Sequence, residues 1–109
     1  MVRTTLAALA CLLSACAQVA ERGADAPRRI VSLDYCADQY VLKFADREDI
    51  LALSPDAGKR FSYMRAAAEG IPTVRPRTAD VLALQPDLVV RTYGGGHDIA
   101  DFMKEPGVP

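Results

Sequence analysis

The chain has 109 residues, with 13 lysines and arginines against 14 aspartates and glutamates, a formal net charge of −1. This balance argues against nucleic-acid binding, because a surface that displaces counterions from phosphates needs clustered basic residues. Half of the residues are apolar, which excludes a disordered acidic tail, and the length allows one domain at most. Three cysteines and one histidine lack the spacing of a four-ligand zinc site, so we expect neither a metal nor another cofactor.

The first 16 residues have the pattern of an export signal. Arg3 provides a positive start, and residues 6–13 form an unbroken apolar run. This run is too short to cross a hydrocarbon core of ~30 Å, so a transmembrane helix is the poorer interpretation. The Leu-Ser-Ala-Cys sequence that ends at Cys16 resembles a bacterial lipobox, in which the cysteine is lipidated; ordinary cleavage after Ala17 is the alternative. Both predict a periplasmic protein, and the lipobox adds a lipid anchor, the one membrane contact that we expect.

A strand and a helix are predicted after a polar tether. Residues 17–28 form the tether, and residues 30–33 are a short β-branched run typical of a strand. The chain then turns into a helix at residues 34–37, with Tyr40, Val41 and Phe44 at helical spacing. After a charged connection, residues 50–53 predict the second strand.

Turn signals separate the next elements. A turn cluster over residues 54–58 precedes Ser62, which could cap a helix over residues 63–69, with Gly70 at the left-handed position that ends it. Residues 71–74 predict a brief third strand. Thr78 is then expected to cap a short helix that Pro86 stops.

The last predicted strand, residues 88–90, is apolar throughout, as expected of a strand buried on both faces. A glycine-rich loop and a helix over residues 98–104 follow it, and residues 107–109 resemble the approach to a fifth strand. Strands that alternate with short helices predict the α/β class, a three-layer Rossmann-like unit with a short parallel sheet. Ligands of such sheets bind beyond the carboxyl ends of the strands, which points to four loops: residues 34–37, 54–63, 75–76 and 92–96.

Two segments carry a resemblance to a known family. They are Arg-Ile-Val-Ser-Leu at residues 29–33 and Asp-Val-Leu-Ala-Leu-Gln-Pro-Asp-Leu-Val-Val at residues 80–90. In these motifs the chain resembles the N-terminal lobe of periplasmic substrate-binding proteins of ABC importers, in the subfamily for corrinoids, haem and ferric siderophores. The second motif is quite specific, since a short helix, a Pro-Asp break and an apolar strand recur at this spacing. The resemblance covers residues 28–109.

The resemblance implies a receptor of two lobes that one long helix bridges. A corrinoid, haem or ferric-siderophore ligand is clamped between the lobes, and an inner-membrane ABC permease is the partner. The chain departs from this pattern because it ends inside the first lobe, before the bridging helix and the second lobe. We therefore expect residues 29–109 to be a partial N-terminal lobe, a fragment or the product of a truncated gene, that supplies half of a binding surface.

The family's first two ligand-contacting loops match Tyr35, Cys36 and Tyr63 of this chain. A tyrosine offers an apolar ring and a hydroxyl to a large planar or macrocyclic ligand, and in haem-binding relatives a tyrosinate can ligate iron. Two structural roles compete with ligand binding: Tyr35 could pack over the helix start, and Tyr63 could be a core aromatic. Cys36 is expected to be a small packed residue rather than a nucleophile.

Candidate residues also follow the third and fourth predicted strands. Arg75 could pair with ligand carboxylates, or it could be a solvated loop charge. Thr92, Tyr93 and Gly94 follow the fourth strand, where the family often places an aromatic residue and where glycine lets backbone approach a ligand. His97, a lone histidine in a loop, is expected to be exposed.

Asp80 lies in the helix where the family carries an acidic residue for docking on the permease. Ala79 occupies the adjacent position, at which some members have glutamate. The alternative role of Asp80 is to complement the dipole at the start of the helix with its negative charge.

We expect a binding module rather than an enzyme. No nucleophile–base pair is evident, and one histidine without a convergent acid offers little acid–base machinery. The alternative is a fragment of a Rossmann-like exported enzyme. That enzyme would need a glycine fingerprint after the first strand, and residues 34–37 contain no glycine.

Overall fold

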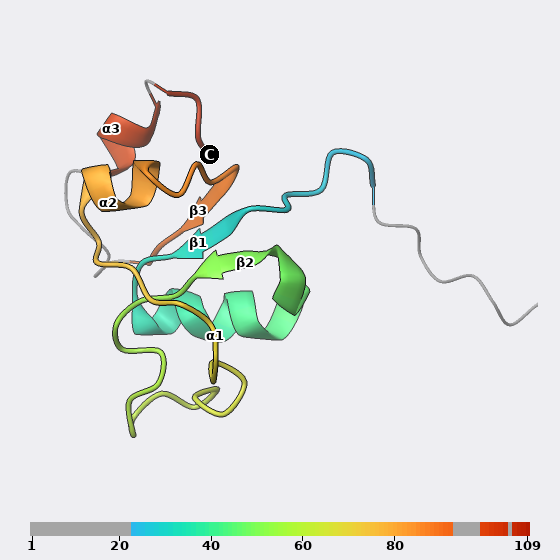
Figure 1. Cartoon of the computed structure of the whole chain (residues 1–109), viewed down its shortest axis with the longest axis vertical. Helices are drawn as coiled ribbons and strands as arrows, with labels where there is room; N and C mark the ends of the chain where they lie inside the picture. Colours follow the sequence, from blue (N-terminus) through green and yellow to red (C-terminus); the bar gives the residue numbers. More distant parts are fainter. Residues whose placement is uncertain (1–22, 93–98, 105) are drawn as a thin grey trace, which may run out of the picture.

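Three short parallel strands form the sheet of the molecule, in the order β2-β1-β3 (Figure 1). The computed structural model describes residues 23–92, 99–104 and 106–109. Within this part, the central strand β1 (Ile30–Ser32) pairs with β2 (Ile50–Ala52) on one side and with β3 (Leu88–Val90) on the other. The predicted α/β class with a short parallel sheet is confirmed.

Helices cover both faces of this sheet and give it three layers. Helix α1 (Tyr35–Phe44) packs on one face, and α2 (Thr78–Leu82) and α3 (Ile99–Lys104) lie on the other (Figure 1). A 3-10 helix, Arg47–Asp49, links α1 to β2. No helix in the described ranges is long and apolar enough to cross a membrane.

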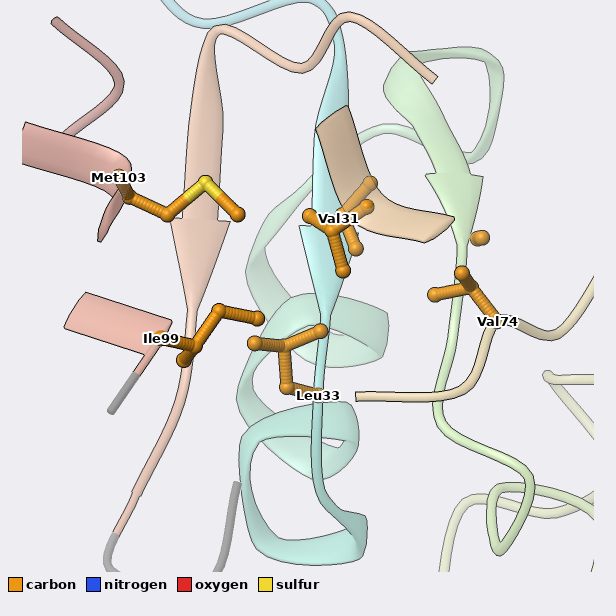
Figure 2. Close-up of a cluster of buried hydrophobic side chains, with 7 residues drawn as sticks. Val31, Leu33, Val74, Ile99 and Met103 are labelled. Atoms are coloured by element: carbon orange, nitrogen blue, oxygen red, sulfur yellow. The ribbon is translucent and has the colours of Figure 1, made fainter. Parts of the chain in front are cut away.

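The core consists of two apolar clusters, one on each side of the sheet. Successive strand residues contribute to opposite sides, so Val31 lies in the cluster below α2 and α3, whereas Ile30 lies in the cluster beside α1. Figure 2 shows Ile99 and Met103 of α3 reaching toward Val31 and Leu33 of the central strand segment. This packing fixes the side of the sheet on which each helix lies.

Strand β3 is less buried than the sequence predicts. All three of its residues are half-buried, although its apolar run had the pattern of a strand covered on both faces. Along its outer edge, the Val89 amide donates to the Pro109 carbonyl at 2.8 Å, so the chain end lies beside β3 where a further strand was expected. On the α1 side, Leu88 and Val90 line an open groove.

Helix α1 begins where the sequence predicts. Asp34 is its N-cap, and the carboxylate accepts from the Ala37 amide at 2.9 Å. Of the three apolar residues at helical spacing, only Val41 is buried; Tyr40 and Phe44 are 61% and 80% exposed. These two aromatic side chains border the groove instead of entering the core.

The helix predicted over residues 63–69 is wrong. The segment is a succession of turns, with bonds such as that from the Ala67 amide to the Met64 carbonyl at 2.9 Å. Ser62 does not cap it, because the hydroxyl accepts from Gln39 Nε2. The Arg47 guanidinium donates hydrogen bonds to the carbonyls of Ala67 and Glu69. A side chain distant in sequence therefore satisfies carbonyl groups that a longer helix would have paired with its own amides. The predicted left-handed glycine is confirmed, since Gly70 has a φ of +78°.

Two other predicted elements are shorter or shifted. The strand expected over residues 71–74 is reduced to a single bridge between Leu53 and Thr73, next to a proline that has no amide to donate. Thr78 is the first residue of α2 rather than its cap, and the cap position, Arg77, makes no side-chain capping bond. The helix ends before Pro86, and the Arg29 guanidinium donates to the carbonyls that follow it.

The described part of the predicted tether, residues 23–28, contains neither helix nor strand. Its end is fixed by Asp87, whose carboxylate accepts from the Arg28 and Arg29 amides at 3.0 Å each. These bonds lower the pKa of Asp87. The predicted signal, residues 1–16, lies outside the described residues.

Candidate functional site

The carboxyl ends of the three strands lead into loops at one edge of the sheet. The loop after β1 begins α1 and carries Tyr35 and Cys36; the segment after β2 carries Tyr63; and Thr92 follows β3. Four residues predicted from the sequence therefore belong to segments that leave this edge.

Asp34 is the polar centre of the edge. Besides capping α1, its carboxylate accepts from the Thr92 amide at 2.6 Å and from the Thr92 hydroxyl at 2.7 Å. Burial raises the pKa of this carboxyl, but hydrogen bonds from Ala37, Thr92 and Cys36 outweigh it and leave the pKa below its ordinary value. The Thr92 hydroxyl is thus committed to Asp34, and this bond joins the end of the β3 segment to the start of α1. Sequence reasoning placed Asp34 in the loop of residues 34–37 without giving it a role, although an aspartate between a strand and a helix is a common capping signal.

An aromatic pair stands beside Asp34. The rings of Tyr35 and Phe61 meet edge to face, with centroids 5.6 Å apart and an interplanar angle of 86°. Although they pack on each other, Tyr35 is 47% and Phe61 64% exposed. Sequence reasoning missed Phe61, which had no periodic apolar neighbours to mark it.

The phenol of Tyr35 stays protonated at neutral pH. A hydrogen bond with the neighbouring Cys36 side chain raises the pKa of Tyr35 above its usual value of 10.0, and desolvation and the negative Asp34 add to this rise. Cys36 itself is a free, half-buried thiol. The pair therefore offers a ligand apolar ring surface and a neutral hydroxyl.

Tyr63 lies on the same loop as Phe61 and is 88% exposed, so its interpretation as a core aromatic is wrong. Its ring is available at the surface two residues from the aromatic pair.

Helix α1 holds the loop that carries these aromatics. Asp38 is completely buried, and its carboxylate accepts from the Ser54 amide at 3.0 Å and the Ser54 hydroxyl at 2.6 Å. The next residue of the helix, Gln39, donates to the Ser62 hydroxyl at 2.9 Å and accepts from the Met64 amide at 2.8 Å. Both ends of the segment from Ser54 to Met64 are therefore tied to one helix, which orders the aromatic surface before any ligand binds.

Two predicted residues with separate roles are paired with each other. Arg75 Nε lies 3.2 Å from Asp80 Oδ2, with side chains that are 64% and 34% exposed. Asp80 lies in the first turn of α2, the position that complements the helix dipole. A ligand carboxylate at Arg75 or a basic partner at Asp80 would have to compete with this ion pair.

The remaining predicted residues lie outside the described part: Cys16, Tyr93, Gly94 and His97. Among residues 23–92, 99–104 and 106–109, no three His, Cys, Asp or Glu side chains come together in a group that could hold a metal ion.

Comparison with known proteins gives no match for this chain among protein-family models, curated proteins or solved structures.

Proposed function

We propose that the chain is the exported substrate-binding component of an ABC importer. Its ligand is an iron complex (a siderophore or haem) or cobalamin. The observation that supports this most is the exposed aromatic pair, Tyr35 and Phe61, at the carboxyl edge of a parallel sheet. The motifs at residues 29–33 and 80–90 and the export pattern at the N-terminus point in the same direction.

Exposed aromatic rings favour a ligand with broad apolar surface. Tyr35, Phe61 and Tyr63 leave ring area in contact with water, and covering apolar area is worth roughly 25 cal/mol per Å². A macrocycle or a siderophore can cover several rings at once, and its polar edge can meet the phenol hydroxyls. The ties from Asp38 and Gln39 mean that little ordering of the loop is needed upon binding.

The proposal also predicts how tightly residues 29–109 bind the ligand. The resemblance implies a ligand held between two lobes, and residues 29–109 resemble part of the N-terminal one. Half of a binding free energy of ~8–9 kcal/mol leaves roughly 4 kcal/mol, a dissociation constant in the millimolar range. A useful test must therefore detect weak binding.

NMR titration of the isotope-labelled protein meets this requirement. Cobalamin, gallium protoporphyrin and a gallium-loaded siderophore are suitable probes, because none of them broadens signals through a paramagnetic metal. With at least one probe, we expect saturable shifts in the amide signals of Tyr35, Cys36 and the segment from Phe61 to Met64.

Two alanine variants provide the comparison. Phe61→Ala should weaken the titration, because the ring is part of the proposed surface. Tyr40→Ala is the matched control, since Tyr40 is an aromatic of similar exposure, 61% against 64%, that lies beside the groove. Absence of shifts with all three probes, or shifts that depend on Tyr40 instead of Phe61, would contradict the proposal.

A further inference from the structure

A second apolar surface lies at the other end of the sheet. It is an open groove of about 410 Å³ between the outer side of α1 and the strands, lined by Tyr40 and Phe44 of α1, by Ile30, Leu88 and Val90 of β1 and β3, and by Pro27 of the tether. The groove borders the start of β1 and the end of α1, whereas the aromatic pair follows the carboxyl ends of the strands. The two surfaces are therefore separate.

The groove leaves apolar side chains exposed, as a surface does when the segment that covers it is absent. Phe44 is 80% exposed, and β3 is only half-buried on a sheet whose other strands are well covered. Soluble proteins seldom leave contiguous apolar surface of this kind uncovered. An apolar segment that filled the groove would extend the core beside α1, which already contains Ile30 and Val41.

We propose that the apolar run at residues 6–13 of the same chain occupies this groove until the export signal is removed. The chain before Gly23 reaches the described structure at the rim of the groove, because Ala26 and Pro27 line it. Nine residues lie between Leu13 and Gly23, so ten residue-to-residue steps join the two. At about 3.3 Å per step they can span up to ~33 Å, so the connection permits the run to fold back.

The leucines of the run have the spacing that such a groove requires. Leu6, Leu9 and Leu13 are three and four residues apart, the spacing of large apolar anchors on one side of a helix laid into a hydrophobic groove. Alanines and Cys11 fill the intervening positions except residue 12, which is a further leucine. Because the run is covalently attached, it binds at a high effective concentration and needs little intrinsic affinity.

With this occupant, the exposure of the groove depends on removal of the export signal. In the unprocessed chain the run covers Phe44 and β3; after cleavage at residues 16 or 17 the groove is open. The inference is independent of the proposed ligand, since the aromatic pair lies at the opposite end of the sheet, and either proposal can fail without the other.

Disulfide trapping in the full chain tests the inference directly. The chain is made in a membrane-free translation system, so that residues 1–22 are retained, with Cys11, Cys16 and Cys36 replaced by serine. Leu9→Cys is combined with Phe44→Cys, or with Lys43→Cys as the matched control on the neighbouring, exposed position of α1. Oxidation should give an intramolecular disulfide with Phe44→Cys in about tenfold excess over the control, at a yield independent of protein concentration.

Dye binding provides a readout that needs no added cysteine. In the full chain, Leu9→Gln with Leu13→Gln should free the groove and raise the fluorescence of an apolar-surface dye several-fold, whereas Ala7→Gln should not. The inference is overturned by equal disulfide yields at Phe44→Cys and Lys43→Cys, or by disulfides found only between two chains. Unchanged dye binding in the double leucine variant also overturns it.

Discussion

Asp34 connects the first helix to the last described strand through a single carboxylate. Its oxygens accept bonds from Ala37 at the start of α1 and from both the amide and the hydroxyl of Thr92 after β3. Bonds to an ionised acceptor are roughly twice as strong as neutral ones. The geometry of the candidate site therefore depends on this residue being charged.

Acid should weaken the fold through Asp34. Its pKa is lowered in the folded protein, so the charged carboxylate contributes stability above the unfolded pKa of about 3.9, and this contribution is lost as the pH falls through the folded value. In Asp34→Asn, the amide nitrogen faces a donor at Thr92, so the variant is less stable at pH 7. We expect the difference in unfolding free energy between wild type and variant to shrink as the pH falls below about 4. Urea titrations at several pH values measure it, with the exposed Asp25→Asn as control; a constant difference would contradict this role.

Removal of the Thr92 hydroxyl should also destabilise the edge. Thr92→Val keeps the shape of the side chain but leaves the charged Asp34 without one donor, a loss of about 1.5–3 kcal/mol for a bond to a charged group. Urea unfolding at pH 7 measures the change. Thr73→Val is the matched control, because Thr73 is exposed, and a loss of equal size in both variants would show that the hydroxyl of Thr92 has no special role.

At the scale of elements, α1 organises the loop that carries the aromatics. Gln39→Leu keeps the volume of the side chain but removes the bonds to the Ser62 hydroxyl and the Met64 amide. We expect hydrogen exchange at Met64 to quicken by about tenfold, which corresponds to ~1.4 kcal/mol, while exchange in β1 stays unchanged. Lys43→Leu, on the exposed part of the same helix, should leave both unaffected. Unaltered exchange at Met64 would show that the loop is ordered by other contacts.

The elements that could be predicted from sequence are those that local signals determine. The strand at β1, the start of α1 and the left-handed Gly70 follow from an apolar run, a turn with apolar residues at helical spacing after it, and a glycine. The turns in place of a helix after Ser62 could not be predicted, because they depend on Arg47 and Gln39, which are distant in sequence. Alanine-rich composition favours a helix there, and tertiary hydrogen bonds override it.

The candidate site was predictable to a similar extent. The rule that ligands lie beyond the carboxyl ends of parallel strands placed Tyr35 and Tyr63 after the first and second strands, where the structure has them. It could not identify Phe61 as the partner of Tyr35, since a ring contact between separate loops leaves no periodic trace in the sequence. Nor could it show that Arg75 and Asp80, assigned to different partners, form one ion pair.

At the scale of the whole molecule, the sheet carries an apolar surface at each end. The two surfaces differ in the hydrogen bonds that hold them. The aromatic pair is held by polar ties from α1, whereas Phe44 and Tyr40 project beside an open groove. A ligand of small mass can cover the first surface. The second is lined by apolar residues of α1, β1 and β3, which favours an apolar polypeptide segment as its occupant.

The protein without residues 1–16 should therefore self-associate through the groove. With the apolar run removed, the exposed ring of Phe44 and the half-buried residues of β3 remain as the least covered apolar surface beside α1. Burying a phenylalanine side chain is worth about 1.5–3 kcal/mol, so Phe44→Gln should weaken association by roughly ten- to a hundredfold. Sedimentation velocity over a range of concentrations measures the association constant, with Lys43→Gln, at the neighbouring residue of α1, as the matched control. Monomeric behaviour of the processed wild-type chain at all concentrations would show that the groove is tolerated uncovered, and an equal effect of both substitutions would place the contact elsewhere.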